Sequence, residues 1–217
     1  MTQRRNSAVE HAISSIRDSI RLGKYAPGQR LVVAELSKKL SVSAGPVREA
    51  IRRLTGEGVI DITPNRGAAV RDFNAQELAD IFRVREVVEG LAARLAAENV
   101  DKNDYRARLI ATLEEMRRIV SNKEDGYVQL NQSFHELIYE MAENRRLFEL
   151  ASQLTFPIYR LRMHYHMSRS HIAPSAQEHE AVAAAILAGN GWLAEDRMRQ
   201  HVRTSGAAMV AAINSDR

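Results

Sequence analysis

Apolar residues recur at helical spacing along most of this chain, whereas strand-like signals are confined to one short region. Between residues 59 and 70, two β-leaning runs, Val59–Thr63 and Ala68–Val70, flank a Pro-Asn-Arg-Gly turn. Elsewhere the three-and-four spacing predicts helices. In the second part of the chain these cover residues 77–99, 101–121, 127–143, 146–167, 175–188 and 192–213, with an interruption at 168–174. The pattern therefore predicts a mainly α protein whose later part is an antiparallel all-α bundle.

The stretch from Glu35 to Arg71 predicts a helix-turn-helix followed by a small β-wing. Two short amphipathic segments are separated by Ser41–Gly45, which has room only for a tight corner between helices. Pro46 then falls in the first turn of the second helix, where its missing N–H removes no helical bond. Ahead of this stretch, residues 7–22 carry an apolar stripe typical of a further helix, with Ser7 as its expected N-cap.

The outer face of the second of these helices carries Arg48, Arg52 and Arg53. Arginines near the start of such a helix suit a DNA major groove, where phosphate contacts position the helix and base contacts specify the sequence. Charged runs are more often ordinary solvated faces, but here corner, proline, helix and wing occur in the order that DNA binding requires. We therefore expect Arg48 in the major groove and Arg66, at the wing tip, against the duplex.

Charge divides the chain in the same way. Residues 1–71 hold 13 Lys/Arg against 6 Asp/Glu, whereas residues 72–217 hold 18 against 21. A basic first module and a mildly acidic remainder indicate that only the first meets a polyanion, and we place the domains at 1–72 and 73–217. The chain has no cysteine, no signal-peptide pattern and no run of about 20 apolar residues, so we expect a cytoplasmic protein without a membrane partner.

Three histidines of the second module are placed by geometry near one point. His179 and His201 lie equally far from the Gly189-Asn190-Gly191 corner, and equal distance from the turn of a helix hairpin means equal height. His135 has Asn131 one turn before it on its own helix. Three imidazoles and one side-chain oxygen predict a divalent metal site, with zinc preferred and nickel or another first-row metal acceptable. The other histidines are expected to be ordinary core or surface residues; they are His11, His164, His166 and His171.

Several motifs of the first module together resemble the winged-helix domain of GntR-family transcription regulators. They are Pro27-Gly28-Gln29-Arg30-Leu31, Val42-Ser43, Pro46-Val47-Arg48-Glu49-Ala50, Leu54, Glu57-Gly58-Val59 and Arg66-Gly67-Ala68-Ala69-Val70. The resemblance implies DNA contacts from Arg30, Ser43, Ala44, Gly45, Arg48, Arg52, Arg66 and Gly67. Many relatives carry Arg-Thr where this chain has Ala44-Gly45, so some of their contacts are lost here or supplied elsewhere.

The second module resembles the effector-binding FCD domain of the FadR subfamily, in its shorter six-helix form. The motifs are Phe82–Ala92, Phe134-His135-Glu136-Leu137, Glu178-His179, Ala188-Gly189 and Met198–Val202. In metal-binding relatives an aspartate and three histidines are the ligands. The resemblance places His135, His179 and His201 on the histidine positions and Asn131 on the aspartate position. It also implies that Arg85 binds an effector carboxylate, although an internal ion pair between Arg85 and Glu89 explains a buried arginine equally well.

Together these features predict a ligand-responsive transcription regulator rather than an enzyme. We expect a homodimeric repressor that binds double-stranded operator DNA and responds to a small organic acid. One alternative is a metal-dependent enzyme acting on a small organic acid; Glu136 is a poor general base for it, because it points about 100° away from His135 on the helix. The other is an architectural DNA-binding protein, for which a pocket of histidines and arginine would have no purpose.

Overall fold

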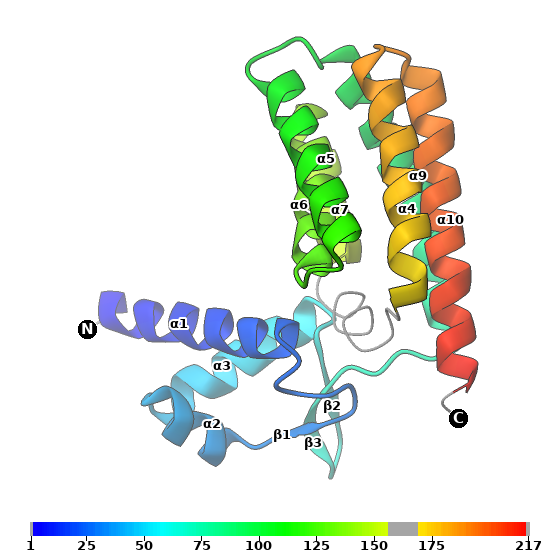
Figure 1. Ribbon diagram of the computed structural model, residues 1–217. Coiled ribbons are helices and arrows are strands. Elements are labelled where there is room, and N and C mark those ends of the chain that lie inside the picture. Colours follow the sequence, from blue (N-terminus) through cyan, green and yellow to red (C-terminus); the bar gives the residue numbers. More distant parts are fainter. Residues whose placement is uncertain (1, 156–168, 216–217) are drawn as a thin grey trace. The chain divides into compact units, whose positions relative to one another are not determined.

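The computed structural model describes residues 2–155 and 169–215, and their contacts form two compact units. The first unit contains the described chain up to Phe73, and the second contains Asn74–Leu154 and the described residues from 169 onward. In Figure 1 the first unit runs from blue to cyan, and the second from cyan-green to red. Each unit is described separately below.

The first unit combines three helices with a small antiparallel sheet. Its elements are α1 (Thr2–Arg21), β1 (Arg30–Leu31), α2 (Val33–Leu40), α3 (Ala44–Gly56), β2 (Ile60–Thr63) and β3 (Gly67–Val70). The strand order is β1-β3-β2, and both pairings are antiparallel. Fully buried apolar side chains from all three helices and the wing form one core, which includes Ile16, Leu36, Leu54 and Val59. The predicted winged helix-turn-helix is therefore confirmed.

The corner between α2 and α3 and the tip of the wing both depend on backbone with positive φ. Ser41 ends α2 at φ 54° and sends the chain towards α3. At the wing tip, Asn65 has φ 64° and Gly67 has φ 82°, so the turn closes directly into β3. Glycine adopts the second of these conformations without strain, which explains its place at the start of the strand. The result is a short hairpin that projects Arg66 at its exposed end.

The first helix begins earlier than the sequence pattern predicted. α1 starts at Thr2 rather than after Ser7, so Ser7 lies inside the helix and is not its N-cap. No glycine or proline lies between Thr2 and Ser7, and nothing in this polar segment forces the helix to begin later. The apolar stripe marked the buried part of the helix and missed its polar beginning.

The second unit is an all-helical bundle built around α4. The described helices are α4 (Ala75–Glu98), α5 (Tyr105–Asn122), α6 (Tyr127–Met141), α7 (Arg145–Thr155), α9 (Arg169–Leu187) and α10 (Gly191–Ser215). α4 packs against α6, α9 and α10, and α5 packs against α6 and α9. The predicted mainly α fold is confirmed. No helix among the described residues has the length and apolar content needed to cross a membrane.

Two local features fix α4 in this bundle. Its first turn is closed by a capping box, in which the Asn74 side chain accepts from the Glu77 N–H and the Glu77 side chain accepts from the Asn74 N–H. Farther along, α10 approaches α4 closely at Gly206, where an added Cβ would lie 2.7 Å from the Phe82 ring. This glycine is therefore needed for the close approach of the two helices, because any larger residue would collide with the ring.

The segment before Pro174 differs from the prediction. We expected residues 168–174 to interrupt the helices, but α9 begins at Arg169 and contains Pro174. Proline removes one helical hydrogen bond. Packing offsets this loss, because Ile172 and Ala176 lie against an apolar cluster with Ile119 and Tyr127. Of the helix expected at 146–167, the part to Thr155 is seen as α7, and the remainder lies outside the described residues.

Candidate DNA-binding surface and metal centre

The N-terminal end of α3 presents a small and open surface. Ser43 precedes the helix in an extended conformation and its side chain makes no capping hydrogen bond. Ser43 and Gly45 are exposed, and the space around Gly45 is empty within 4 Å of where a Cβ would stand. Short side chains here let a phosphate or a base edge approach the helix N-terminus closely, where the helix dipole favours negative charge.

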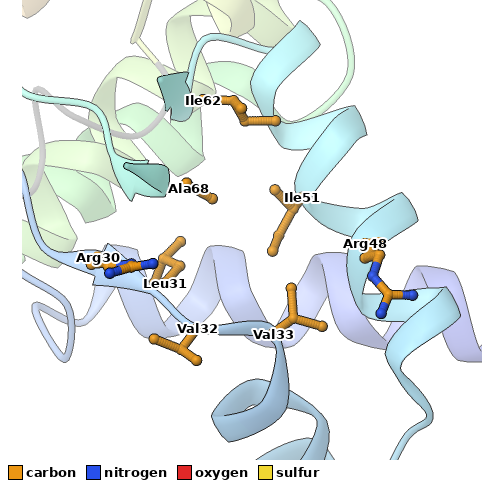
Figure 2. A pocket seen from close by; sticks show the side chains of 9 residues that line it. Arg30, Leu31, Val32, Val33, Arg48, Ile51, Ile62 and Ala68 are labelled. Carbon is orange, nitrogen blue, oxygen red and sulfur yellow. The ribbon is translucent and has the colours of Figure 1, made fainter. Parts of the chain in front are cut away.

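A groove separates α3 from the sheet, and two arginines lie at it. Figure 2 shows Arg48 on α3 and Arg30 on β1 beside this groove, which has a volume of about 320 Å³. Its apolar lining includes Ile51 from α3 and Ile62 from β2. Both arginines are exposed. The first unit thus carries cationic side chains on the two sides of a groove next to the predicted recognition helix.

The other two arginines of α3 are held by carboxylates of the same unit. Arg52 donates to Glu49 at 2.7 and 3.0 Å, and Arg53 bonds both Glu49 and Glu10, the latter at 2.8 Å. Hydrogen bonds first from Arg52 and then from Arg53 lower the pKa of Glu49 to about 2. Arg52 therefore has to release Glu49 before it can contact DNA. The sequence spacing alone did not indicate this.

At the wing, the structure places Arg66 and Gly67 as expected for a projecting tip. Both are exposed, and Arg66 N–H donates to the Thr63 carbonyl to close the turn. The Arg30 guanidinium lies near Gly67, and its Nε and Nη2 atoms are each 3.7 Å from where a Cβ of residue 67 would stand. A side chain at Gly67 would meet Arg30 only in ordinary van der Waals contact, but it would strain the backbone, because φ is 82° here.

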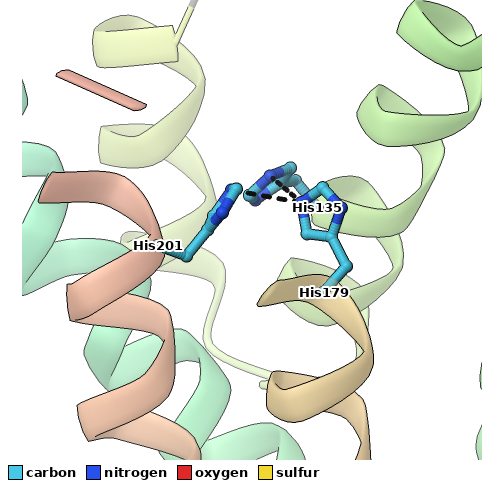
Figure 3. A group of neighbouring side chains, drawn as sticks. All are labelled: His135, His179 and His201. Atoms are coloured by element: carbon cyan, nitrogen blue, oxygen red, sulfur yellow. Dashed lines mark hydrogen bonds between the residues drawn. The ribbon is translucent and has the colours of Figure 1, made fainter. Parts of the chain in front are cut away.

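In the second unit three buried histidines converge from three helices. His135 lies on α6, His179 on α9 and His201 on α10, and none is more than 7% exposed. Figure 3 shows their rings turned towards one another. The Nε2 atom of His179 lies 3.4 Å from that of His135 and 3.1 Å from that of His201. The convergence predicted from the helix hairpin and from the α6 histidine is thus present in the structure.

Each of these rings is held by a different side chain on its other nitrogen. Nδ1 of His135 lies 2.8 Å from Glu89 Oε2, and Nδ1 of His201 lies 2.8 Å from Glu178 Oε2. Nδ1 of His179 lies 3.2 Å from the Tyr127 hydroxyl, which in turn donates to Ser175 Oγ at 3.0 Å. Where the Glu178 carboxylate and the Tyr127 hydroxyl accept from Nδ1–H, the Nε2 atoms of His201 and His179 are left to face the cluster, while the Glu89 carboxylate lies at ion-pair distance from His135 Nδ1.

Burial favours the neutral form of two of these imidazoles, His135 and His179. It lowers the pKa of His135, against the raising effect of the Glu89 carboxylate. Burial, followed by the charges of His201 and His135, holds the pKa of His179 well below its usual range. For Glu89, burial raises the pKa, but the charge of the Arg85 guanidinium and the contact with His135 outweigh it and lower the value to about 2. The centre therefore combines three imidazoles with an ionised carboxylate just behind one of them.

The residues present fit a divalent metal ion. Ligand nitrogens at ~2.0–2.1 Å from a tetrahedral zinc lie about 3.4 Å apart, close to the separations between the Nε2 atoms. Neutral lone pairs at such short distances repel one another unless a cation or a proton lies between them. Each ring is also oriented through its Nδ1 atom, as in protein metal sites generally. Among the described residues, these three histidines form a group able to hold such an ion.

Asn131 and Arg85 are the two other residues that the sequence predicted to act together with these histidines. Asn131 is buried on α6, one turn before His135, as its spacing predicted. Arg85 is 2% exposed and its Nε and Nη2 atoms lie 2.8 and 2.6 Å from Glu89 Oε1. The internal ion pair that the spacing allowed is therefore present, and Glu89 links Arg85 to His135.

The sequence reasoning missed three of the side chains that orient the rings. Glu89 was recognised only as a partner of Arg85. Glu178 directly precedes His179 in sequence but bonds His201, and Tyr127 bonds His179 from another helix. No local spacing reports such contacts, because they arise when α6, α9 and α10 pack together.

Neither the other two described histidines nor Glu136 joins the cluster. His11 and His171 are exposed, and His164 and His166 lie outside the described residues. Glu136 is exposed and accepts from Gln132, so it does not face the imidazoles as a general base would.

Comparison with known proteins agrees with this division of the chain. The FCD domain model matches residues 80–204, and the model for bacterial regulatory proteins of the gntR family matches residues 8–70. The HTH-type transcriptional repressor RspR of Escherichia coli (strain K12) is 27% identical over 197 residues, which cover 88% of this chain and 85% of RspR. The uncharacterized HTH-type transcriptional regulator YdhC of Bacillus subtilis (strain 168) is 26% identical over 182 residues, 83% of this chain and 79% of YdhC.

The solved structures show the same fold. The E. coli McbR/YncC structure superimposes with a TM-score of 0.80 at 22% identity, covering 94% of this chain and 98% of that one. The matched models and curated relatives are DNA-binding transcription regulators rather than enzymes. They imply DNA binding by the first unit and a small-molecule effector for the second. With a winged helix-turn-helix followed by an FCD domain that encloses the three histidines, the chain belongs to the FCD-containing branch of the GntR family of transcription regulators.

Proposed function

We propose that this regulator is a homodimeric repressor whose FCD domain holds a divalent metal ion and a small carboxylate effector. The observation that carries the metal is the convergence of three Nε2 atoms at 3.1 and 3.4 Å, with every Nδ1 atom held from behind. His135, His179 and His201 would bind the ion, with the Asn131 side-chain oxygen as a neutral fourth ligand. Zinc suits such ligands, and nickel is the main alternative.

The metal would supply a cationic anchor for an organic acid. The chain itself would supply the orientation: Glu89 and Glu178 lie 2.8 Å from the Nδ1 atoms of His135 and His201 and would favour the tautomer that presents Nε2 to the ion. Arg85 is the second cation that we propose for the effector carboxylate. Because its guanidinium also bonds Glu89, an arriving carboxylate would compete with Glu89 for it.

This competition offers a route from effector to DNA. Arg85 and Glu89 both lie on α4, which follows the wing after a short connection. An effector that binds Arg85 would alter the position of α4. This would in turn change the spacing of the two DNA-binding units in the dimer. Coupling free energies between such sites are typically about 1–3 kcal/mol, or roughly 5- to 150-fold in affinity.

The name repressor rests on relatives: RspR and GlaR of E. coli are both named transcriptional repressors, at 27% and 26% identity. DNA targets would be selected from random duplexes with the purified full chain and should be palindromic or nearly so, because a two-fold dimer reads two half-sites. Organic acids would then be screened by thermal shift with the zinc-loaded and the chelated protein. We expect at least one acid to stabilise only the zinc-loaded form and to weaken operator binding. Failure to select any DNA would contradict the proposal. So would an acid that stabilises the chelated protein as much as the zinc-loaded protein.

A further inference from the structure

Helix α4 carries two stripes of apolar residues, and only one of them faces the core. The buried stripe includes Leu78, Phe82 and Val88. On the opposite side, Val84, Val87 and Leu91 are 48%, 51% and 40% exposed. The alternating three- and four-residue spacing of these residues places them on one line along the helix, as in the contact seam of a helix pair.

Opposite charges mark the two ends of this exposed line. The same spacing continues to Asp80 at the N-terminal side and to Arg94 at the C-terminal side, and these two residues lie equally far in sequence from Val87. Beyond Arg94 the surface is widened by Trp192 of α10, whose ring lies 3.8 Å from the Arg94 guanidinium carbon and which is 70% exposed. We call Asp80, Val84, Val87, Leu91, Arg94 and Trp192 the outer stripe of α4.

This charge pattern is complementary to itself in one orientation. If a second α4 packs antiparallel across a two-fold axis at Val87, Asp80 faces the partner's Arg94, and Val84 lies within one residue of the position opposite the partner's Leu91. Val87 then meets the partner's Val87 on the axis. A parallel arrangement would instead place Asp80 against the partner's Asp80 and Arg94 against the partner's Arg94, and like charges in contact are unfavourable.

The flank of the stripe has the composition of an interface rim. On the side where α10 lies beside α4, two ion pairs border the apolar line, Arg203 with Glu86 and Arg199 with Glu195. Apolar side chains at the centre with charged groups around them are the usual anatomy of a specific protein contact. Tryptophan and arginine are also among the residue types that contribute most to binding in protein interfaces.

We propose that the outer stripe of α4 is the self-association surface of this protein, and that a second copy packs there antiparallel across a two-fold axis at Val87. The inference rests on the proposed homodimer and names its surface and register. α4 also holds Arg85 and Glu89, so dimer contact and effector centre would share one helix. A shift of α4 caused at the effector centre would therefore also move the dimer contact, and the reverse.

The first test is the oligomeric state of the full chain by sedimentation velocity over a range of concentrations. Val87→Asp places two carboxylates together on the axis, and we expect the dimer dissociation constant to rise at least roughly 100-fold, because a like-charge pair replaces an apolar contact. Ile110→Asp is the matched control, since Ile110 is 40% exposed on α5, outside the stripe. Circular dichroism would show that both variants remain folded.

The second test concerns the register. Asp80→Arg or Arg94→Asp alone should weaken the dimer roughly 3- to 10-fold at low salt, since each breaks two symmetric surface ion pairs. The double variant, which exchanges the two charges, should restore it. Trp192 is the only tryptophan of the chain, so acrylamide quenching reports directly on its burial. Quenching should be weak in the parent dimer and strong in Val87→Asp.

The outcomes separate the surface from the proposed function. A parent dimer that persists in Val87→Asp overturns the surface but leaves dimerisation standing. A parent that is monomeric at micromolar concentration, with and without operator, overturns both. Weakening by Val87→Asp without restoration by the double charge exchange overturns the antiparallel register. Equal weakening by Ile110→Asp would show that the effect is not specific to the stripe and would also overturn it.

Discussion

Glu89→Gln should separate the roles of charge and shape at the histidine cluster. Glu89 is 1% exposed, and its two oxygens serve different partners: Oε1 accepts from Arg85 at 2.6 and 2.8 Å, and Oε2 lies 2.8 Å from His135 Nδ1. Glutamine has nearly the same shape but is neutral, and one of its two ends is a donor. If its oxygen keeps Arg85, its amide N–H₂ faces His135.

The consequence for the metal centre follows from the tautomer. An amide donor opposite Nδ1 forces the Nδ1 lone pair of His135 to accept, so the proton moves to Nε2 and blocks that ligand. Changes in groups that orient a metal ligand typically cost about 10- to 100-fold in metal affinity. We therefore expect zinc affinity to fall within this range, while His179 and His201 still provide two ligands.

The same change should reduce the stability of the metal-free protein. It leaves the buried Arg85 guanidinium beside a neutral group, and removing one partner of a buried pair typically costs about 3–5 kcal/mol; a hydrogen bond retained to the glutamine oxygen would place the result at the lower end of that range. The free energy of unfolding would be measured by urea denaturation in the presence of a chelator, and zinc affinity by competition with a fluorescent chelator.

Glu86→Gln is the matched control on the same helix. Glu86 is a partner of Arg203 at the surface, with 20% and 59% of the two side chains exposed. Loss of a surface pair costs about 0–1 kcal/mol, and zinc affinity should not change. The reasoning would be refuted if Glu89→Gln bound zinc as tightly as the parent, or if the two variants lost the same stability.

Three further changes test other parts of the structure. Arg48→Ala should weaken operator binding by about 1–3 kcal/mol in a gel-shift titration at fixed salt if Arg48 reads a base, whereas Arg52→Ala should cost less, because Arg52 must first leave Glu49; equal affinities for parent and Arg48→Ala would remove Arg48 from the interface. Asn131→Asp should tighten zinc binding in the competition assay by adding a negative charge at the ion, and unchanged affinity would exclude residue 131 as a ligand. Gly206→Ala should lower the free energy of unfolding by about 1–3 kcal/mol, because its Cβ would lie 2.7 Å from a ring, and a parent-like urea midpoint would contradict the packing described for α4 and α10.

The parts of the fold that could be predicted from sequence are those set by local rules. The corner after Ser41 and the turn at the wing each depend on a few adjacent residues, and both were located correctly. The convergence of His179 and His201 also followed from a local rule, since equal distance from the turn of a helix hairpin means equal height.

What could not be predicted depends on packing between distant segments. Arg52 is turned along its own helix by Glu49, and spacing cannot say which of several nearby partners an exposed arginine will choose. The helix through Pro174 is stable because neighbouring helices bury the residues around it. The partner of Glu178 is also set by packing between helices: Glu178 is adjacent to His179 in sequence, yet it bonds His201.

The most direct test of the account is the zinc content and zinc affinity of His179→Ala compared with His171→Ala. Both residues lie on α9, but His179 is fully buried at the centre of the cluster and His171 is exposed. After removal of metal and titration with zinc, the parent and His171→Ala should each bind one ion per chain tightly, and His179→Ala should lose that binding while circular dichroism still reports a folded helical protein. A parent that binds no zinc or nickel, or a folded His179→Ala that binds the ion as tightly as the parent, would contradict the metal centre proposed here.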